Sequence, residues 1–399
     1  MSQDLIARSA DLKRLRDEGY DITIRSNHIV INEVPYVNSN RDVKLGTLIS
    51  ELTLNGDIAG PPSTHVALWA GDQPCDQHGA VITAIRHGAS SQRIDEGLVA
   101  NFSFSNKPSD GYRDYYAKVT TYVAIVTHPA QAIDPRVSPL TFPVVEDKED
   151  SSPFRYVDTA SSRAGIYSIT KKLELPKLAI VGLGGTGSYV LDLVAKTPVN
   201  EIHIFDGDVF SNHNAFRSPG AASIDDLRAK PRKVDHFCAL YSRMRRRIVA
   251  HGYHIDATNV DQLREMSFVF ICIDEGKGKK VLVEKLEEFG IPFVDVGMGL
   301  YEVDGSLAGT VRVTTSTPTQ RDHLRKHVGL NEAAGNDEYS RNIQIADLNA
   351  LNAALAAIKW KKLFGFYKDL DQEHQSTYTI NGNDMANEEC SGAPTCSHS

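Results

Sequence analysis

The segment GLGGTG at 182–187 carries four glycines, placed between an aliphatic run and an apolar, helix-like stretch. Glycine loses more backbone freedom on folding than any other residue, so this cluster needs a chemical reason. Gly182 permits a tight turn, and Gly184 and Gly185 allow the backbone to approach phosphate oxygens. Gly187 allows the following helix to pack closely on the preceding strand. Because backbone amides and a helix N-terminus then favour an anion, the segment predicts a nucleotide-binding loop.

An acidic residue, Asp206, ends the next predicted strand. Its carboxylate can accept hydrogen bonds from both hydroxyls of a ribose. A strand, a glycine loop, a helix and such a carboxylate are shared by sites for NAD, FAD and ATP. The loop alone therefore leaves the nucleotide open, and a glycine turn without a ligand remains the alternative.

The polar residues that follow Asp206 favour a triphosphate. They are Asp208, Asn214, Arg217, Lys230 and Lys233. Cleavage of ATP between its α- and β-phosphates builds charge on the leaving pyrophosphate, which cations stabilise. A hydride-transfer enzyme has no comparable need for this set behind the ribose carboxylate. Each charge alone is most often a surface feature, but their joint order at strand ends favours phosphate chemistry.

A further carboxylate, Asp274, ends the predicted strand SFVFICID. It is expected at the C-terminal edge of a parallel sheet, where ligands of open α/β sheets bind. At that edge a carboxylate can hold Mg²⁺ on phosphate oxygens. The sequence therefore predicts Asp274 as the magnesium ligand of the site.

From residue 177 onward the chain alternates predicted strands with predicted helices. The strands lie at 177–184, 201–208, 267–274 and 291–299, and the helices at 187–196 and 282–290. This alternation is typical of a mainly parallel sheet with crossover helices, so we expect an α/β domain over 163–382. A later run, 343–364, predicts a long helix. Its apolar face is formed by Ile345, Leu348, Leu351, Leu355 and Ile358, and it is expected to serve packing or a dimer interface.

The first 145 residues lack this alternation and predict a smaller α+β domain, 1–145. Its expected elements are a helix at 5–18, a hairpin at 22–31 that turns at 26–28, and β-like runs at 65–70, 80–85, 98–104 and 115–126. The polar, acidic segment 146–162 is typical of a linker. The polar end of the chain, 383–399, is expected to be a flexible tail.

The composition excludes several classes of protein. The chain has 399 residues with 24% charged residues and a net charge of −8, and its basic clusters are short, so nucleic acid is not an expected partner. No long uncharged apolar run predicts a membrane-spanning helix, and the N-terminus does not read as a signal peptide. Five cysteines at irregular spacing, without a CxxC pair, fit a reduced cytoplasmic protein without a paired-cysteine zinc site.

The order of these residues resembles the ThiF/MoeB/HesA family of adenylyltransferases, which share their fold with ubiquitin-activating enzymes. The resemblance covers about 160–365 and rests on GLGGTG, Asp206-Gly-Asp208, Asn214-Ala-Phe-Arg217, Lys230 and Lys233, and CID at 272–274. It implies a Rossmann-like ThiF-type adenylation domain with a mainly parallel sheet. It also implies a homodimer that uses ATP and Mg²⁺ to adenylate the C-terminal glycine carboxylate of a ubiquitin-like protein.

The same resemblance implies roles for individual residues. Arg217 and a lysine would contact the phosphates, and Asp274 would hold Mg²⁺. The family's lysine usually precedes a small residue and an acid, a pattern that Lys233-Val-Asp fits better than Lys230. Arg163 is similar to the arginine that dimers of the family lend to the ATP of the neighbouring subunit.

The chain also departs from that family. Many relatives carry two CxxC pairs for zinc, and this chain has none. Activating enzymes that form a thioester often place the cysteine before the long helix, but 310–345 contains no cysteine. Cys390 and Cys396 are the remaining candidates for a thioester, with a tail cysteine of no function as the alternative. Acidic neighbours disfavour a thiolate at Cys390.

The N-terminal domain resembles the extra domain that precedes the adenylating domain in some bacterial ubiquitin-like conjugation systems. This implies partner recognition or support of a dimer, a conjugating enzyme as a further partner, and a place in defence against phage. Cys75 could suggest the cysteine of a conjugating enzyme, but the flanking pattern of those enzymes is missing.

Three other functions remain open on the sequence. The first is an adenylating enzyme that acts on a sulfur-carrier protein, a peptide or a tRNA base. The second is an NAD(P)-dependent oxidoreductase built on the same glycine loop. The third is a scaffold that keeps the fold without catalysis, against which the complete set of charged residues argues.

Overall fold

The chain forms two compact units in a computed structural model that describes residues 2–147, 152–274, 277–329, 343–388 and 390. The first unit comprises Met1–Asp147 with Val157–Gly165, and the second comprises Lys148–Tyr156 with Ile166–Ser399. In the described residues, no helix is both long and apolar enough to cross a bilayer.

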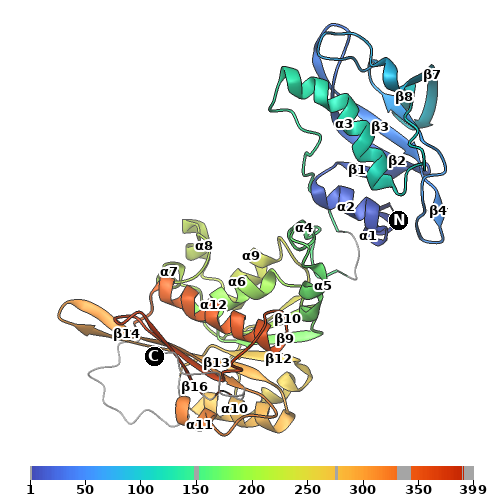
Figure 1. The fold of residues 1–399 in the computed structure, drawn as a ribbon. Helices are drawn as coiled ribbons and strands as arrows, with labels where there is room; N and C mark the ends of the chain where they lie inside the picture. Colours follow the sequence, from blue (N-terminus) through green and yellow to red (C-terminus); the bar gives the residue numbers. More distant parts are fainter. Residues whose placement is uncertain (1, 148–151, 275–276, 330–342, 389, 391–399) are drawn as a thin grey trace. The chain divides into compact units, whose positions relative to one another are not determined.

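The first unit is a six-stranded antiparallel sheet with the strand order β1-β2-β3-β6-β8-β7 (Figure 1). Its strands are β1 (Ile22–Arg25), β2 (His28–Val37), β3 (Val43–Glu51), β6 (Val66–Ala70), β7 (Arg86–Asp95) and β8 (Leu98–Ser105), with β4 (Leu54–Asn55) and β5 (Ile58–Ala59) as a separate short pair. The hairpin expected at 22–31 is present, because β1 pairs with β2 and the turn falls at Ser26 and Asn27. The expected helix at 5–18 is divided at Ser9 into α1 (Ser2–Arg8) and α2 (Ala10–Glu18).

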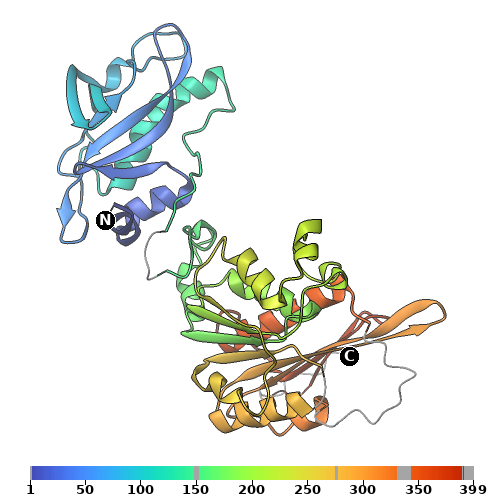
Figure 2. The same cartoon turned by 180° about the vertical axis from the view of Figure 1, so that it is seen from behind.

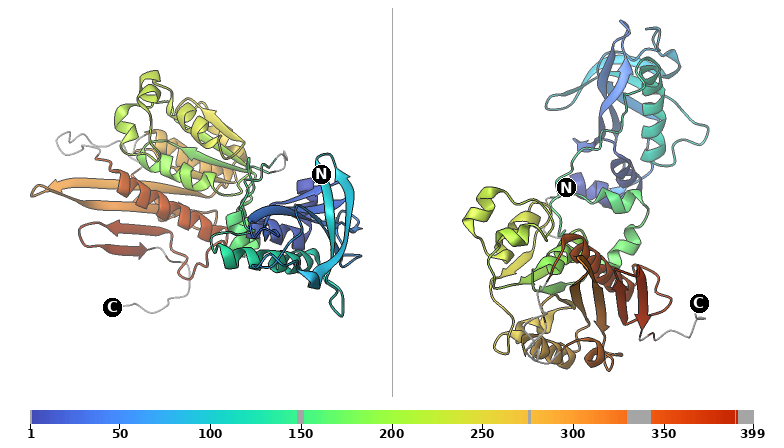
Figure 3. Two further views of the ribbon diagram at one scale, coloured as in Figure 1. Left: turned by 90° about the horizontal axis from the view of Figure 1, so that it is seen from above. Right: turned by 90° about the vertical axis from the view of Figure 1, so that its left-hand side faces the viewer.

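The β-like run expected at 115–126 is wrong, because these residues lie in the helix α3 (Tyr115–Ile133). Figure 3 shows α3 lying along one face of the sheet. The Asp114 side chain caps the helix by accepting a hydrogen bond from the Ala117 amide at 2.7 Å. Buried side chains follow the helix period, at Tyr115, Val119, Tyr122, Val123 and Val126. Packing of this face outweighs the strand propensity of tyrosine, valine and threonine. The run expected at 80–85 is also wrong in part, since Thr83–Ile85 forms a short 3-10 helix.

The second unit is built on an eight-stranded sheet with the order β11-β10-β9-β12-β13-β14-β15-β16 (Figure 2). The first five strands in that order are parallel, and the last three continue antiparallel. The strands are β9 (Lys177–Val181), β10 (Glu201–Phe205), β11 (Ile248–His251), β12 (Phe268–Ile271), β13 (Phe293–Val303), β14 (Ser306–Ser316), β15 (Gln375–Thr379) and β16 (Asp384–Glu388). The fold is therefore the expected α/β, Rossmann-like domain.

Helices cover both faces of this sheet, so its central strands are apolar on both sides. On one face α6 (Gly185–Ala195), α9 (Lys233–Tyr241) and α12 (Ala346–Leu363) pack over Leu178 and Ile180 of β9. On the other face α10 (Lys277–Phe289) packs over Ala179 and Val181 of the same strand. The short helices are α4 (Thr159–Arg163), α5 (Tyr167–Thr170), α7 (Asn212–Ala215), α8 (Ile224–Ala229) and α11 (Leu324–His327).

The long helix expected at 343–364 is confirmed as α12, but its buried face differs from the expected one. Ile358 of the expected apolar face is 42% exposed. The helix instead buries asparagines and small residues with one tryptophan, at Asn349, Asn352, Ala353, Ala356 and Trp360. Small side chains allow α12 to approach α6 closely, and both asparagines contribute to the pocket described below.

The expected linker and tail both contain ordered segments. Within 146–162, the Arg155 amide donates to the Met244 carbonyl at 2.9 Å, which ties this segment to the second unit. Within 383–399, β16 forms an edge strand of the large sheet. The strand is exposed along its whole length and most of its residues are polar, and for that reason the pattern resembles a tail.

Candidate functional site

A pocket of about 800 Å³ lies at the carboxyl ends of β9, β10 and β12, against the middle of β13 and beside the N-terminal half of α12. The parallel strands β10, β9 and β12 end side by side here, while β13 continues past them, so side chains far apart in the sequence meet. Eight of the residues that the sequence assigned to the site line this pocket: Gly182, Gly184, Gly185, Asp206, Asp208, Arg217, Lys233 and Asp274.

The glycine loop has two parts with different roles. Gly182 has a φ of +91°, and an added Cβ there would collide with the Cys272 carbonyl of the neighbouring strand end. An added Cβ on Gly187 would collide with the Gly182 carbonyl, and Gly187 does not line the pocket. These two glycines therefore serve the turn and its packing. Gly184 has open space where a side chain would begin, so its backbone faces the pocket without obstruction.

Asp206 orients the loop as well as facing the pocket. It is 5% exposed, and its carboxylate accepts hydrogen bonds from the Leu183 amide at 2.7 Å and from the Asp208 amide at 2.9 Å. A carboxylate has about four acceptor positions, so two amide bonds leave capacity for a ribose. The bond to Leu183 crosses from the end of β10 to the glycine loop after β9, and it holds the two together.

Lys233 is buried between the two carboxylates of the site. Its ammonium lies 2.6 Å from an oxygen of Asp208 and 3.4 Å from an oxygen of Asp206. The hydrogen bond from Lys233 holds the pKa of the Asp208 carboxyl below its ordinary value. Lys230 is exposed at the end of α8 and does not line the pocket. Of the two lysines that the sequence offered, Lys233 is the one at the site.

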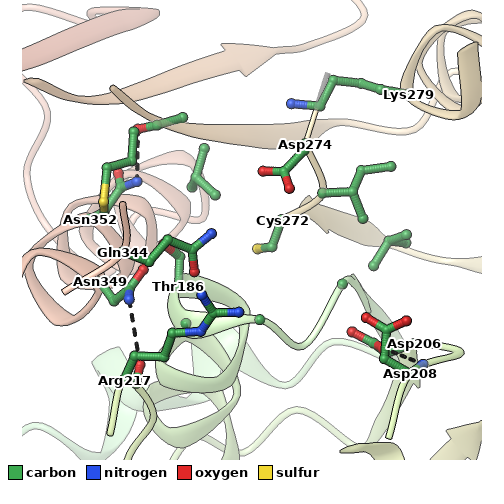
Figure 4. A pocket seen from close by; sticks show the side chains of 18 of the residues that line it. Thr186, Asp206, Asp208, Arg217, Cys272, Asp274, Lys279, Gln344, Asn349 and Asn352 are labelled. Carbon is green, nitrogen blue, oxygen red and sulfur yellow. Dashed lines mark hydrogen bonds between the residues drawn. The ribbon is translucent and has the colours of Figure 1, made fainter. Parts of the chain in front are cut away.

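Arg217 brings a guanidinium into the pocket (Figure 4). Its backbone carbonyl lies 3.5 Å from Nδ2 of Asn349, and its backbone amide donates to the Asn214 carbonyl at 3.1 Å. Its side-chain Nε is buried and has no hydrogen-bond partner among the described residues. A buried donor of this kind is costly unless a ligand or water completes it, so this guanidinium is suited to an anion.

Asn214, which the sequence placed among the nucleotide ligands, does not line the pocket. Its side chain is 4% exposed and accepts a hydrogen bond from the Ser211 amide at 2.8 Å. This bond is half of a capping box that starts α7. Asn214 therefore positions Arg217 through the backbone.

Asp274 follows β12 and turns its carboxylate into the pocket, where Figure 4 shows it opposite Arg217. Among the described residues, no group of three or more His, Cys, Asp or Glu side chains could enclose a metal ion. One carboxylate together with substrate phosphates is a common way to hold Mg²⁺, so Asp274 fits that role without further protein ligands.

Residues that sequence reasoning missed form the other half of the pocket. Asp295 is fully buried, and its two oxygens pair with Lys279 at 2.7 Å and with Arg312 at 2.8 Å. Asn349 and Asn352 of α12 line the pocket beside them. The presence of a charged residue, Asp295, inside the otherwise apolar run 291–299 was a signal that could have found this group.

Three of the described thiols have a raised pKa, which disfavours the thiolate that a nucleophile needs. Burial raises the pKa of Cys272, which lines it, and the Asp295 carboxylate adds to this effect. Burial also raises the pKa of Cys75, and its thiol is 1% exposed. Cys390 is exposed, and partial desolvation with the acidic Asp371 raises its pKa. Cys396 lies outside the described residues.

Arg163 does not belong to the compact unit that carries the pocket. It ends α4 in the first unit, where its guanidinium lies 4.7 Å from the centre of the Phe142 ring. This is a cation–π contact within that unit.

Comparisons with known proteins give the following results. The model of the ThiF family matches residues 160–393, and a domain of unknown function (DUF6791) matches residues 10–159. No curated protein matches the chain. A crystal structure of PaaA has a TM-score of 0.45 and 16% identity, covering 56% of this chain and 76% of that one. A crystal structure of Escherichia coli MccB with MccA-N7isoASN has a TM-score of 0.46 and 19% identity, covering 59% and 73%.

Proposed function

The chain belongs to the ThiF family of adenylating enzymes, and we propose that it activates the C-terminal carboxylate of a ubiquitin-like protein with ATP. One observation carries the proposal. The guanidinium of Arg217, with its unpartnered Nε, and the carboxylate of Asp274 face one pocket above a glycine loop. A cation for phosphates and an anion for Mg²⁺ at opposite walls suit a triphosphate better than a nicotinamide.

The nucleotide would lie with its ribose at Asp206 and its phosphates over Gly184 and Gly185. The amides of the loop and the N-terminus of α6 favour the phosphate charge. Mg²⁺, held by Asp274, would neutralise part of the charge that develops on the leaving pyrophosphate. Lys233 offsets one of the two negative charges of Asp206 and Asp208, and so it weakens the repulsion between the ribose end and the phosphates.

The reaction would be an in-line displacement at the α-phosphorus. A carboxylate oxygen of the substrate bonds to phosphorus, the bond to the β-phosphate oxygen breaks, and its electron pair leaves with pyrophosphate. Arg217 stabilises the charge on the transferring or leaving phosphates. The remaining residues position the two reactants, because phosphoryl chemistry depends mainly on alignment and charge neutralisation.

The side of the pocket that carries Lys279 and Arg312 favours a substrate with a carboxylate. Lys279 and Arg312 bring two positive charges to the single carboxylate of Asp295. The excess charge lies in the same pocket as Asp274 and Arg217. A negatively charged end of a peptide chain is therefore attracted to this side. After adenylation, a thiol of Cys390 or Cys396, or one of a conjugating enzyme, would attack the acyl carbon, the bond to the phosphate oxygen would break, and AMP would leave. The N-terminal domain would serve partner recognition.

The nucleotide is tested by calorimetry with ATP and Mg²⁺ and with NADH. We expect ATP to bind wild type and to bind Arg217→Ala at least about tenfold more weakly, because a charge-assisted contact is lost. Arg228→Ala, an exposed arginine of α8 outside the pocket, is the matched control. Tight binding of NADH with no binding of ATP would refute the proposal.

The substrate is tested by exchange of labelled pyrophosphate into ATP in the presence of candidate carriers. A carrier with its terminal glycine should support exchange, and the same carrier with that glycine removed should not. Asp274→Asn should lower exchange on the order of a hundredfold while the protein stays folded. Exchange that depends on a short peptide alone, or on a nucleic acid, would replace the ubiquitin-like substrate.

A further inference from the structure

Two histidine rings are in direct contact at one end of the large sheet, where β11 pairs with β10. Nδ1 of His203 on β10 lies 3.0 Å from Nε2 of His251 on β11. The ring centres are 5.2 Å apart and the rings are nearly parallel, at 13°. The ring of His251 also stacks on Phe205, with 4.1 Å between the centres. These contacts fix the direction in which each ring nitrogen points.

Each ring has a second polar partner at its other nitrogen. Nε2 of His203 lies 2.6 Å from Oε1 of Glu201, and Nδ1 of His251 lies 3.0 Å from the hydroxyl of Tyr253. That hydroxyl in turn donates to Oε1 of Gln262 at 2.6 Å. With polar partners on both sides, neither ring can be turned over without losing a hydrogen bond. The five side chains therefore form one continuous chain of hydrogen bonds.

The contact between the rings limits the number of protons that the pair can hold. A hydrogen bond between two ring nitrogens contains one proton, because two would repel and none would leave two lone pairs facing each other. His203 donates to Glu201 through Nε2, since a carboxylate only accepts. The neutral pair can add one proton at Nδ1 of His251, because the Tyr253 hydroxyl can then donate to Gln262 instead. A second added proton has no place while the rings stay in contact.

The charged groups packed around the pair agree with this count. Glu201 of β10 faces His203, and Glu265, in the 3-10 helix Val260–Glu265, also interacts electrostatically with it. Lys177 of β9 pairs with Glu265 at 2.6 Å and offsets one of these two carboxylates. The remaining negative charge favours a single proton on the pair. Burial and the charge of His203 together hold the pKa of His251 below its ordinary value of 6.5.

The end of β11 connects the pair to the nucleotide pocket. The backbone carbonyl of His251 accepts a hydrogen bond from the amide of Asp206 at 3.2 Å. The Tyr253 amide donates to the same carbonyl at 2.9 Å, so the chain turns at once. His254 then lines the pocket, with Nε2 3.5 Å from Oδ1 of Asp208. Separation of the two rings would therefore disturb the backbone that holds Asp206.

We propose that His203 and His251 are a positioning pair for Asp206, which keeps the ribose end of the pocket in place as long as one proton lies between the two rings. The inference rests on the proposed binding of ATP. When a further proton from solvent charges both rings, the contact breaks and the carbonyl that holds the Asp206 amide is displaced. Nucleotide affinity is therefore expected to fall in acid, before any catalytic group of the pocket titrates.

The first test is calorimetry with ATP and Mg²⁺ between pH 5.0 and 7.5 on wild type and His251→Gln. The glutamine amide can still donate to His203 and accept from Tyr253, but it does not titrate. Between pH 7.5 and 5.0 the dissociation constant of wild type should rise at least about threefold more than that of the variant, because only the fraction with the rings in contact binds fully. Comparison of the two proteins cancels the titration of ATP itself. His128→Gln, at an exposed position of α3, is the matched control and should follow wild type.

The second test counts ring protons by ¹⁵N NMR, with the signals assigned from His203→Gln and His251→Gln. At about pH 6, where an ordinary exposed histidine is mostly charged, one ring of the pair should remain neutral. Two charged rings at that pH, or an acid dependence of ATP binding that persists in His251→Gln, would overturn the proposal. A neutral ring without any effect on ATP affinity would overturn the link to Asp206. If ATP binds at no pH, the proposed function fails, and the proton count still tests the pair.

Discussion

The side-chain amide of Asn349 occupies the space where a side chain on Gly185 would begin. Asn349 is 1% exposed, and its Oδ1 accepts a hydrogen bond from the Thr186 hydroxyl at 2.9 Å. Its Nδ2 lies 3.5 Å from the carbonyl of Arg217. A single residue of α12 thus contacts both the first turn of α6 and the backbone of Arg217. The geometry of the glycine loop depends on a helix that lies far along the chain.

Gly185→Ala should destabilise the second unit by about 1–3 kcal/mol, because the added methyl group overlaps a buried amide. Denaturant unfolding followed by Trp360 fluorescence, with Trp69 of the first unit replaced by phenylalanine, measures this. Gly184→Ala is the stability control, because its Cβ meets no atom within 4 Å. The double variant Gly185→Ala, Asn349→Ala should recover part of the loss. If removing Asn349 gives no recovery, the steric relationship is not the cause.

Lys233→Met should raise the pKa of Asp208 toward its ordinary value, because the hydrogen bond that lowers it is lost. The stabilisation from a carboxyl with a lowered pKa is present above its unfolded pKa and is lost as the pH falls through the folded value. The difference in stability between wild type and the variant should therefore shrink in acid. Titration of ¹³C-labelled aspartate carboxyls measures the shift, and Lys196→Met, at the exposed end of α6, is the control. An unchanged carboxyl titration would contradict the pairing.

The glycine loop, Asp206 and Asp274 could be predicted from the sequence because their chemistry is tied to local pattern. A glycine cluster after a strand and a carboxylate at a strand end carry their meaning within a few residues. Asn349 and Asn352 could not be predicted in this way. An asparagine in a long helix looks like an exposed residue until α12 is packed against the loop and β13.

In the first unit, the local amino-acid composition led to a wrong prediction of secondary structure. The stretch 115–126 is rich in tyrosine, valine and threonine, which favour strands. Its burial pattern has the period of a helix, and Asp114 stands where a cap is needed. Tertiary packing on the sheet decides the outcome, and the capping residue was the local sign that pointed to it.

Asp295→Ala should destabilise the second unit by about 3–5 kcal/mol, because Lys279 and Arg312 would be left without their shared carboxylate. Lys279 is 2% exposed, so its charge cannot turn to solvent without local rearrangement. Adding Lys279→Met to Asp295→Ala should restore part of the stability. Thermal and denaturant unfolding of wild type, Asp295→Ala, Lys279→Met and the double variant gives the coupling energy. A double variant no more stable than Asp295→Ala would contradict this account of the cluster.

Lys118 of α3 should make the stability of the first unit depend on pH in the alkaline range. It is 1% exposed and donates to Ser50 Oγ at 2.9 Å and to the carbonyls of Thr64 and Val66 at 2.8 and 2.7 Å. Burial lowers the pKa of Lys118 to about 8, from 10.5. Between these values the unfolded chain binds more protons than the folded one, so the free energy of unfolding should rise with pH, by about 3 kcal/mol at most.

The measurement is denaturant unfolding between pH 7 and 11, followed by Trp69 fluorescence in a Trp360→Phe background. Lys118→Met removes the titrating group, so the difference between wild type and this variant isolates its contribution. Lys107→Met, a lysine of the same unit outside the helix, is the control and should follow wild type. A flat difference across the range would mean that the three oxygen acceptors stabilise the ammonium enough to offset its burial, and that the charged lysine persists in the core.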